Sequence, residues 1–287
     1  MQIAHSIEDL RRLLKPAKQR TFVPTMGNLH AGHLELVKVA KKTLPEATSV
    51  ASIFVNRLQF APHEDFDSYP RTFANDCALL EAQGCDVLFV PQEKDLYPEP
   101  QVFKVHPPAE LADILEGAFR PGFFVGVSTV VHKLFNCVQP DVAVFGKKDY
   151  QQLMVIKRMV QQMALPIHIV GVDTLRADDG LALSSRNGYL SADERARAVE
   201  LSGALKHMGA SVRDNLSGNQ SGDASKAISK IEEKAMQSLR DKGWQPDYLV
   251  IRHQHDLSVV TQFSDAPLVV LGAARLGRTR LIDNLEI

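Results

Sequence analysis

The chain has 287 residues, 45% of them hydrophobic and 23% charged, and its formal net charge is −1. This composition is typical of a globular protein with a full apolar core, and the balanced charge argues against a nucleic-acid-binding surface. No segment approaches the roughly 20 apolar residues of a membrane span, and the first residues lack the apolar stretch of a signal peptide. We therefore expect a cytoplasmic protein whose partners are neither membranes nor nucleic acids.

The cysteines favour the same compartment. Cys77, Cys85 and Cys137 are odd in number and share no metal-ligand spacing such as CxxC. A disulfide framework is therefore not expected, and free thiols are typical of a reducing environment.

Short apolar runs alternate with helical patterns through about the first 170 residues, taken in chain order. Strands are expected at 21–23, 48–55, 86–90, 141–145 and 167–172, and helices at 31–42, 72–83, 124–138 and 149–163. Apolar strands separated by helices predict an α/β fold, a Rossmann-like doubly wound parallel sheet covered on both faces. Ligands of such sheets bind at the carboxyl ends of the strands, beside helix N-termini.

The pattern changes after Tyr189. Ser191 with Glu194 three residues later predicts a capped helix start, and that helix is expected to run to about Arg213. An Asn-, Ser- and Gly-rich loop at 214–221, a helix at 224–242 and strands at 248–252, 268–271 and 280–283 follow. We expect a domain of residues 1–173 and a smaller C-terminal α+β domain of residues 174–287.

The strongest local signal is the segment 24–33, PTMGNLHAGH, between an expected strand and an expected helix. Gly27 permits a tight turn and Gly32 leaves space at the helix start. Exposed amides at that end of the helix attract phosphate, and His30 and His33 lie on one helical turn. The simpler alternative is that both histidines are ordinary polar residues at a helix start. A zinc site is disfavoured, because the metalloprotease pattern needs histidines four apart with a glutamate after the first.

The same segment resembles the HxGH signature of the nucleotidyltransferase superfamily. Further segments resemble the pantothenate synthetase family, nearly throughout the chain and in the family's order. They are SIFVNRLQF at 52–60, YPRT at 69–72, GVSTVV at 126–131, KLFN at 133–136, FGKKDYQQL at 145–153, DGLALSSRN at 179–187 and RLIDN at 280–284.

The resemblance implies ATP- and Mg-dependent condensation of pantoate with β-alanine through a pantoyl adenylate, releasing pyrophosphate and then AMP. Both groups that react in the first step are anionic, so positioning and charge neutralisation are expected to dominate catalysis. The resemblance also implies a homodimer formed through the larger domain. The C-terminal domain is expected to act as a lid over ATP.

The resemblance assigns roles to particular residues. Catalysis is expected from His33 as the acid, with His30, Lys148 and Arg186 as phosphate-facing groups. ATP is expected at Met26, Gly27, Asn28, Leu29, His30, Ala31, Gly32, His33, Gly146, Lys147, Lys148, Asp149, Leu175, Leu183, Ser184, Ser185 and Arg186. Gln59 and Gln152 are expected to bind pantoate, Gln59 also to contact β-alanine, and Asn56 to face the substrates. Asp76 is the candidate magnesium ligand, although a Mg ion can be held mainly by phosphate oxygens and water.

Three positions depart from the family pattern. Arg57 stands where the family usually has proline, Phe123 where it has histidine, and Lys147 where it has glutamate. Arg57 loses a fixed φ beside Gln59 and could re-aim it, and Lys147 adds positive charge beside the expected phosphates. The core set of phosphate-facing residues is unchanged, so activity is expected.

Two alternatives remain open from the residues. The chain could be another HxGH nucleotidyltransferase that stops at the adenylated or cytidylylated product. It could also be a nucleotide-binding sensor without turnover, although a sensor needs affinity and not the placement of an acid and cations.

Overall fold

The computed structural model describes residues 1–61, 64, 66–217, 224–262 and 266–287. The chain divides into two compact units. Unit 1 comprises Met1–Lys147 and Gln151–Leu175, and unit 2 comprises Lys148–Tyr150 and Arg176–Ile287. Sequence patterns predicted one boundary after residue 173, whereas three residues at 148–150 also group with unit 2.

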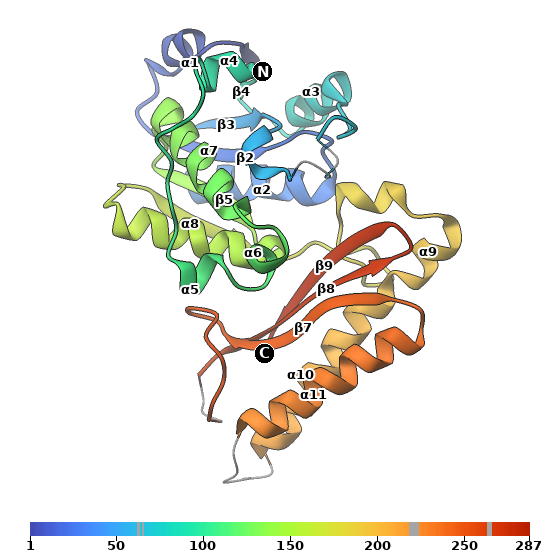
Figure 1. Ribbon diagram of the computed structural model, residues 1–287. Coiled ribbons are helices and arrows are strands. Elements are labelled where there is room, and N and C mark those ends of the chain that lie inside the picture. Colours follow the sequence, from blue (N-terminus) through green and yellow to red (C-terminus); the bar gives the residue numbers. More distant parts are fainter. Residues whose placement is uncertain (62–63, 65, 218–223, 263–265) are drawn as a thin grey trace. The chain divides into compact units, whose positions relative to one another are not determined.

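Unit 1 is built on a parallel sheet, as predicted from the apolar strands. Its strands are β1 (Gln2–Ala4), β2 (Arg20–Thr25), β3 (Thr48–Ile53), β4 (Val87–Phe89), β5 (Val142–Gly146) and β6 (His168–Val172), in the order β1-β4-β3-β2-β5-β6 (Figure 1). Every neighbouring pair is parallel. The order reverses between β2 and β5, and such a reversal opens a crevice at the carboxyl ends of the two strands.

Helices cover both faces of this sheet. α1 (Ile7–Leu14), α7 (Phe123–Val138) and α8 (Tyr150–Gln162) contribute to one apolar cluster, whereas α2 (Ala31–Thr43) and α3 (Phe73–Ala82) contribute to another. Neighbouring strand residues separate accordingly: Phe22 belongs to the first cluster and Val23 to the second. This alternation follows from the two-residue period of a strand. The doubly wound prediction is confirmed.

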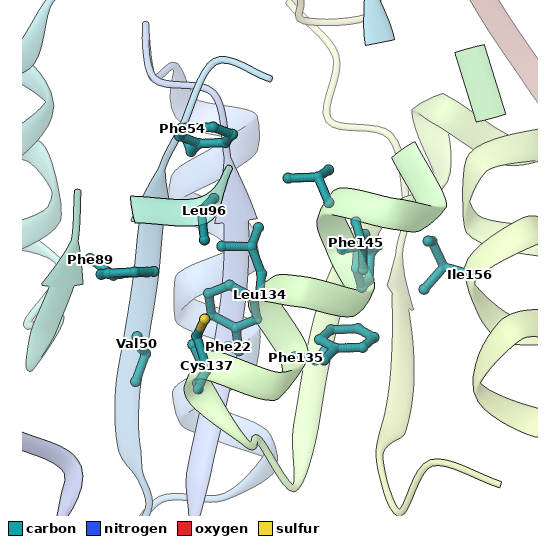
Figure 2. Close-up of a cluster of buried hydrophobic side chains, with 14 of the residues drawn as sticks. Phe22, Val50, Phe54, Phe89, Leu96, Leu134, Phe135, Cys137, Phe145 and Ile156 are labelled. Atoms are coloured by element: carbon teal, nitrogen blue, oxygen red, sulfur yellow. The ribbon is translucent and has the colours of Figure 1, made fainter. Parts of the chain in front are cut away.

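The first cluster is rich in aromatic rings (Figure 2). Phe135 of α7 lies 6.4 Å from Phe22 and 6.4 Å from Phe145, measured between ring centroids, in edge-to-face geometry. Leu134 and Ile156 add aliphatic contacts from α7 and α8. The strands that carry the two turns of interest, β2 and β5, are therefore fixed by a rigid core.

Several short elements were not predicted. They are β1, α1, η1 (Arg57–Gln59), α4 (Glu93–Leu96), α5 (Ala109–Ala112), α6 (Glu116–Phe119) and η2 (Lys147–Asp149). Most are three or four residues long, which is too short for an apolar period to show.

Unit 2 is an α+β unit. η3 (Ser185–Tyr189), α9 (Ala192–Arg197), α10 (Val199–Ser217) and α11 (Ala224–Asp241) precede an antiparallel sheet in the order β7-β8-β9. Its strands are β7 (Gln245–His253), β8 (Leu268–Leu276) and β9 (Thr279–Glu286). The helices pack on this sheet through a separate core that includes Leu205, Met208 and Leu249.

Two local predictions in unit 2 are wrong, and one is confirmed. The expected single helix from Ser191 is broken between α9 and α10, and α10 continues to Ser217, so residues 214–217 are not a loop. The rest of the expected loop, 218–221, lies outside the described residues. The capping box is present, with the Glu194 amide donating to Ser191 Oγ at 3.2 Å and the Ser191 amide donating to Glu194 Oε2 at 2.9 Å.

No helix within the described ranges is both long and apolar enough to cross a bilayer.

Candidate active site

The turn between β2 and α2 is held by hydrogen bonds to the buried carboxylate of Asp76. Gly27 and Asn28 have φ of +82° and +51°, in the left-handed region. The amides of Asn28 and Leu29 donate to Asp76 Oδ2 and Oδ1 at 2.9 and 2.8 Å, and the Thr72 hydroxyl lies 3.1 Å from each oxygen. Asp76 is only 1% exposed. A Cβ on Gly27 would lie 3.1 Å from Asp76 Oδ2, so a residue without a side chain lets the carboxylate approach.

The two histidines close the first turn of α2. His30 is its N-cap: its Nδ1 accepts from the Gly32 amide at 3.1 Å, while His33 Nδ1 accepts from the His30 amide at 3.3 Å. The ring centroids are 4.1 Å apart. An Nδ1 that accepts a backbone N–H carries no proton, so in each neutral ring the proton is on Nε2. Each ring can therefore donate from Nε2, and a second proton on Nδ1 would break the backbone bond.

The expected exposed amides are mostly used within the turn. The Gly27 amide donates to Thr25 Oγ1 at 3.2 Å, and the next two amides donate to Asp76. The amides of His30 and Gly32 donate to imidazole nitrogens. The prediction of exposed amides at the helix start is therefore wrong for Gly32, whose amide donates to His30 Nδ1, whereas the other four amides belong to the turn before the helix. The groups of this turn best suited to an anion are the imidazole Nε2 donors.

A relay of hydrogen bonds orients the amide of Gln59. The Tyr97 hydroxyl donates to Asn56 Oδ1 at 2.8 Å, and Asn56 Nδ2 donates to Gln59 Oε1 at 3.1 Å and to the Gly126 carbonyl at 3.2 Å. Gln59 Nε2 in turn lies 3.1 Å from Met26 Sδ. Burial raises the pKa of Tyr97, with a smaller contribution from Glu93, so the phenol stays a neutral donor. The relay therefore points a donor of Gln59 toward the turn after β2.

The backbone of Gln59 is fixed from the other side. Its carbonyl accepts from Arg120 Nη2 at 3.1 Å, and Arg120 pairs with Glu64 at 2.7 Å. A Cβ on Gly126 would lie 2.2 Å from the Leu58 carbonyl oxygen, so only glycine lets α7 approach η1 this closely. These residues line a cavity of about 400 Å³ together with Lys104 and His106.

Two of the departures from the family pattern have clear partners. The guanidinium of Arg57 lies 3.9 Å from the ring centroid of Phe66, and its Nε lies 3.2 Å from Glu93 Oε1. Phe123 lies under the Arg120 guanidinium at 3.8 Å. Both substitutions thus add cation–π contacts around η1.

The turn after β5 begins at the neighbouring strand end. Lys147 Nζ pairs with Asp173 Oδ1 at 2.7 Å, so the third departure is engaged by a carboxylate. The buried Gln151 donates to the carbonyls of Leu111 and Ile114 at 2.8 Å and accepts from the Glu116 amide at 3.0 Å. Its side-chain amide is therefore occupied by α5, α6 and the residues between them. The next residue, the predicted pantoate ligand Gln152, is partly exposed.

The remaining predicted residues belong to unit 2, apart from Leu175, whose side chain is 39% exposed. The Lys148 carbonyl accepts from Asn284 Nδ2 at 2.9 Å. Ser184 caps η3, with its Oγ accepting from the Arg186 amide at 3.3 Å. Lys148 and Ser184 line one small cavity of about 10 Å³, roughly the size of one water molecule.

The two turns could be predicted from the sequence, whereas the residues that support them could not. Tyr97 and Asn284 were not singled out as site residues, because the bonds they make join positions 41 and 136 residues apart. Among the described residues, no group of three or more histidines, cysteines or acidic residues is placed to hold a metal ion. Asp76 uses both carboxylate oxygens within the protein.

These features define a class of protein. A doubly wound sheet with a histidine-capped helix at its reversal point, beside a second turn at the next strand end, is a nucleotide-binding α/β enzyme. The sequence profile of the pantoate–β-alanine ligase family matches residues 2–286. The chain belongs to this family.

Individual relatives agree over the full length. The chain is 58% identical over 294 residues to the pantothenate synthetase of Leptothrix cholodnii and 60% identical over 291 residues to that of Verminephrobacter eiseniae, with 100% of each chain covered in both cases. The crystal structure of pantothenate synthetase from Thermus thermophilus superposes with a TM-score of 0.86, at 44% identity and 99% coverage of both chains. The pantoate–β-alanine ligase of Francisella tularensis, complexed with βγ-ATP and β-alanine, gives a TM-score of 0.73 at 32% identity, covering 99% of this chain and 97% of that one.

Proposed function

We propose that the chain joins pantoate to β-alanine in two steps at the expense of ATP. In the first step a pantoate carboxylate oxygen attacks the α-phosphorus of ATP and pyrophosphate leaves. In the second step the amine of β-alanine attacks the acyl carbon of pantoyl adenylate, loses a proton and expels AMP. Family membership supports this reaction, and the observation that carries it is the pair of turns at the ends of β2 and β5.

The first step brings two anions together, so charge neutralisation is its main requirement. His30 and His33 are proposed to donate from Nε2 to phosphate oxygens, because their Nδ1 atoms already accept backbone N–H groups. His33 is the proposed acid toward the departing pyrophosphate. Lys148 and Arg186 are proposed to supply fixed positive charge to the same phosphates.

Pantoate is proposed to bind against the amides of Gln59 and Gln152. The Nε2 donor of Gln59 is aimed by Asn56, and a neutral donor suits an oxygen that must remain a nucleophile. A cation at that position would lower the nucleophilicity of the carboxylate. Gln59 is also proposed to contact β-alanine in the second step, and the Francisella tularensis complex with β-alanine supports a site for this substrate in the family.

The rest of the ATP site is proposed along the two turns and the loop of unit 2. It comprises Met26, Gly27, Asn28, Leu29, Ala31, Gly32, Gly146, Lys147, Asp149, Leu175, Leu183, Ser184 and Ser185. The C-terminal unit is proposed to act as a lid. Hydrogen exchange at residues 184–186 should slow when ATP is added, and exchange that ignores ATP would contradict the lid.

Magnesium is proposed to enter as the counter-ion of ATP. A magnesium ion bound to ATP takes most of its ligands from phosphate oxygens and water. Asp76 fits a resident metal poorly. Its two carboxylate oxygens already accept hydrogen bonds from two backbone amides and a hydroxyl, and the residue is only 1% exposed. We also propose a homodimer in the cytoplasm, which analytical ultracentrifugation and cell fractionation would test.

The alternatives are separated by one assay with pantoate, ATP and β-alanine. Pantothenate and AMP, each requiring all three substrates, are the expected products. Accumulation of an adenylate without amide product would favour a nucleotidyltransferase that stops at the first step. ATP binding without pantoate-dependent pyrophosphate release would favour a sensor.

A further inference from the structure

β9 carries two consecutive buried polar residues near the end of the chain. Asp283 is 5% and Asn284 6% exposed, although successive residues of a strand point to opposite faces. They belong to the RLIDN segment, for which sequence analysis gave a resemblance and no role. Buried polar groups are costly unless they are hydrogen-bonded, so their partners indicate what they do.

Asp283 holds Arg176, the residue that begins the segment leading to the proposed phosphate loop 184–186. Its two oxygens accept from Arg176 Nη1 and Nη2 at 2.8 Å each, a bidentate pair. The same guanidinium donates to the carbonyls of Gly180 and Asn284 at 3.0 Å. One side chain of β9 thereby fixes the backbone of residues 176–180, which lead into the proposed phosphate loop 184–186.

Asn284 holds the other proposed phosphate contact of unit 2. Its Nδ2 donates to the carbonyl of Lys148 at 2.9 Å, and the Tyr150 hydroxyl donates to Glu286 Oε1 at 3.0 Å. β9 thus binds the residues on both sides of Asp149. The Asn284 bond fixes the peptide plane that follows Lys148, and hence the direction in which its side chain leaves the backbone.

We propose that Asn284 and Asp283 are positioning residues for ATP, acting through Lys148 and through the loop 184–186. This inference rests on the proposed roles of Lys148 and Ser184–Arg186 at the phosphates. A lysine side chain is long and flexible, so a fixed backbone reduces the conformations that it must lose when it meets a phosphate. β9 therefore does more than complete the sheet, because it orients two separate segments toward one ligand.

The test is a double-mutant cycle on ATP affinity, measured by calorimetry, which requires no turnover. Asn284→Ala is expected to weaken ATP binding about tenfold, as removal of one well-placed hydrogen bond does. In a Lys148→Met background the same substitution should have almost no further effect, since interacting residues are non-additive. Pantoate-dependent pyrophosphate exchange should show a raised KM for ATP and an unchanged KM for pantoate.

Gln254→Ala is the matched control. Its Nε2 also donates to a backbone carbonyl, that of Leu268, at 2.8 Å within the same unit. This variant should lose comparable stability and keep its ATP affinity. If Asn284→Ala does not fold, Asn284→Ser replaces it in the cycle.

Additive effects of the Asn284 and Lys148 substitutions, or a Gln254→Ala variant that loses ATP affinity as much as Asn284→Ala, would overturn the inference. A purely structural role would lower the melting temperature and leave the KM for ATP unchanged, which would also overturn it. A wild-type protein that binds ATP without pantoate-dependent exchange would instead contradict the proposed function, and the binding cycle would still decide the role of Asn284.

Discussion

The two units support their proposed phosphate contacts in different ways. In unit 1 the turn that carries His30 and His33 rests on a buried carboxylate, Asp76, which accepts two backbone amides. In unit 2 the backbone of Lys148 is held by the neutral amide of Asn284. The two supports use opposite chemistry, because backbone amides need a hydrogen-bond acceptor and a backbone carbonyl needs a donor. A charged support is costly to disturb, whereas a neutral one should affect orientation more than stability.

The strongest loss of activity is expected at the histidines of unit 1. His33→Ala should lower pantoate-dependent adenylate formation by about two or more decades, because it removes a proposed acid and a phosphate-facing donor. Pyrophosphate exchange measures it. His33→Asn is the informative partner, since its Oδ1 can still accept from the His30 amide while no donor reaches the position of Nε2.

Both variants should therefore lose about two or more decades of adenylate formation, with His33→Asn close to wild type in melting temperature. Near-normal exchange in a folded His33→Asn protein would contradict the role given to Nε2.

The next largest effect concerns the charged support. Asp76→Asn replaces an acceptor facing an amide by a donor, and should destabilise the protein by about 3 kcal/mol. For a unit of this size that corresponds to a melting temperature lower by about 6–12 °C. Activity should fall with it, because the turn that carries His30 loses its support.

Magnesium titration of the Asp76→Asn variant separates the turn-holding role from the metal assignment. If Asp76 holds the turn, excess magnesium should not restore activity. Recovery at high magnesium would instead identify Asp76 as a ligand of the ion.

A smaller effect is expected where the support acts on substrate orientation. Tyr97→Phe removes the hydroxyl that donates to Asn56 Oδ1 and should raise the KM for pantoate about five- to tenfold, as loss of one hydrogen bond does. The KM for ATP should not change, since Gln59 is proposed to contact pantoate. Tyr69→Phe, at another buried tyrosine, is the control. Equal changes in both KM values would refute the relay.

The smallest effect is expected on stability at His132 of α7, which belongs to neither the Asp76 nor the Asn284 support. Burial lowers the pKa of His132 from its ordinary value of 6.5, so between the two values the folded protein binds fewer protons than the unfolded chain. Stability should therefore rise with pH through this window and decline as the pH falls below 6.5. His132→Gln should flatten the pH dependence of the free energy of unfolding between pH 5 and pH 7, because the substituted side chain does not titrate in this range. Denaturant titrations at pH 5 and pH 7 measure the free energy of unfolding of both proteins. If its change between the two pH values is the same in wild type and His132→Gln, the assignment is contradicted.

Local patterns were sufficient for most of the fold because they repeat within a few residues. Apolar runs predicted five of the strands of unit 1, and the spacing of Ser191 and Glu194 predicted a capping box that is present. The break between α9 and α10 was missed, because the helical pattern continues through Ala198. The motifs of the proposed site were named from the sequence, whereas the hydrogen bonds among their residues could not be.

The parallel sheet, the turns at 24–33 and 145–149, and membership in the ligase family could all be inferred from residue types and motifs along the chain. Each depends on side-chain type and spacing along the chain. Three contacts became evident only in the folded molecule: Asp76 accepts the amides of the turn, Tyr97 orients the amide of Gln59 through Asn56, and Asn284 donates to the carbonyl of Lys148. Such contacts join residues far apart in the chain, and a single buried polar side chain looks the same in a sequence whichever partner it finds.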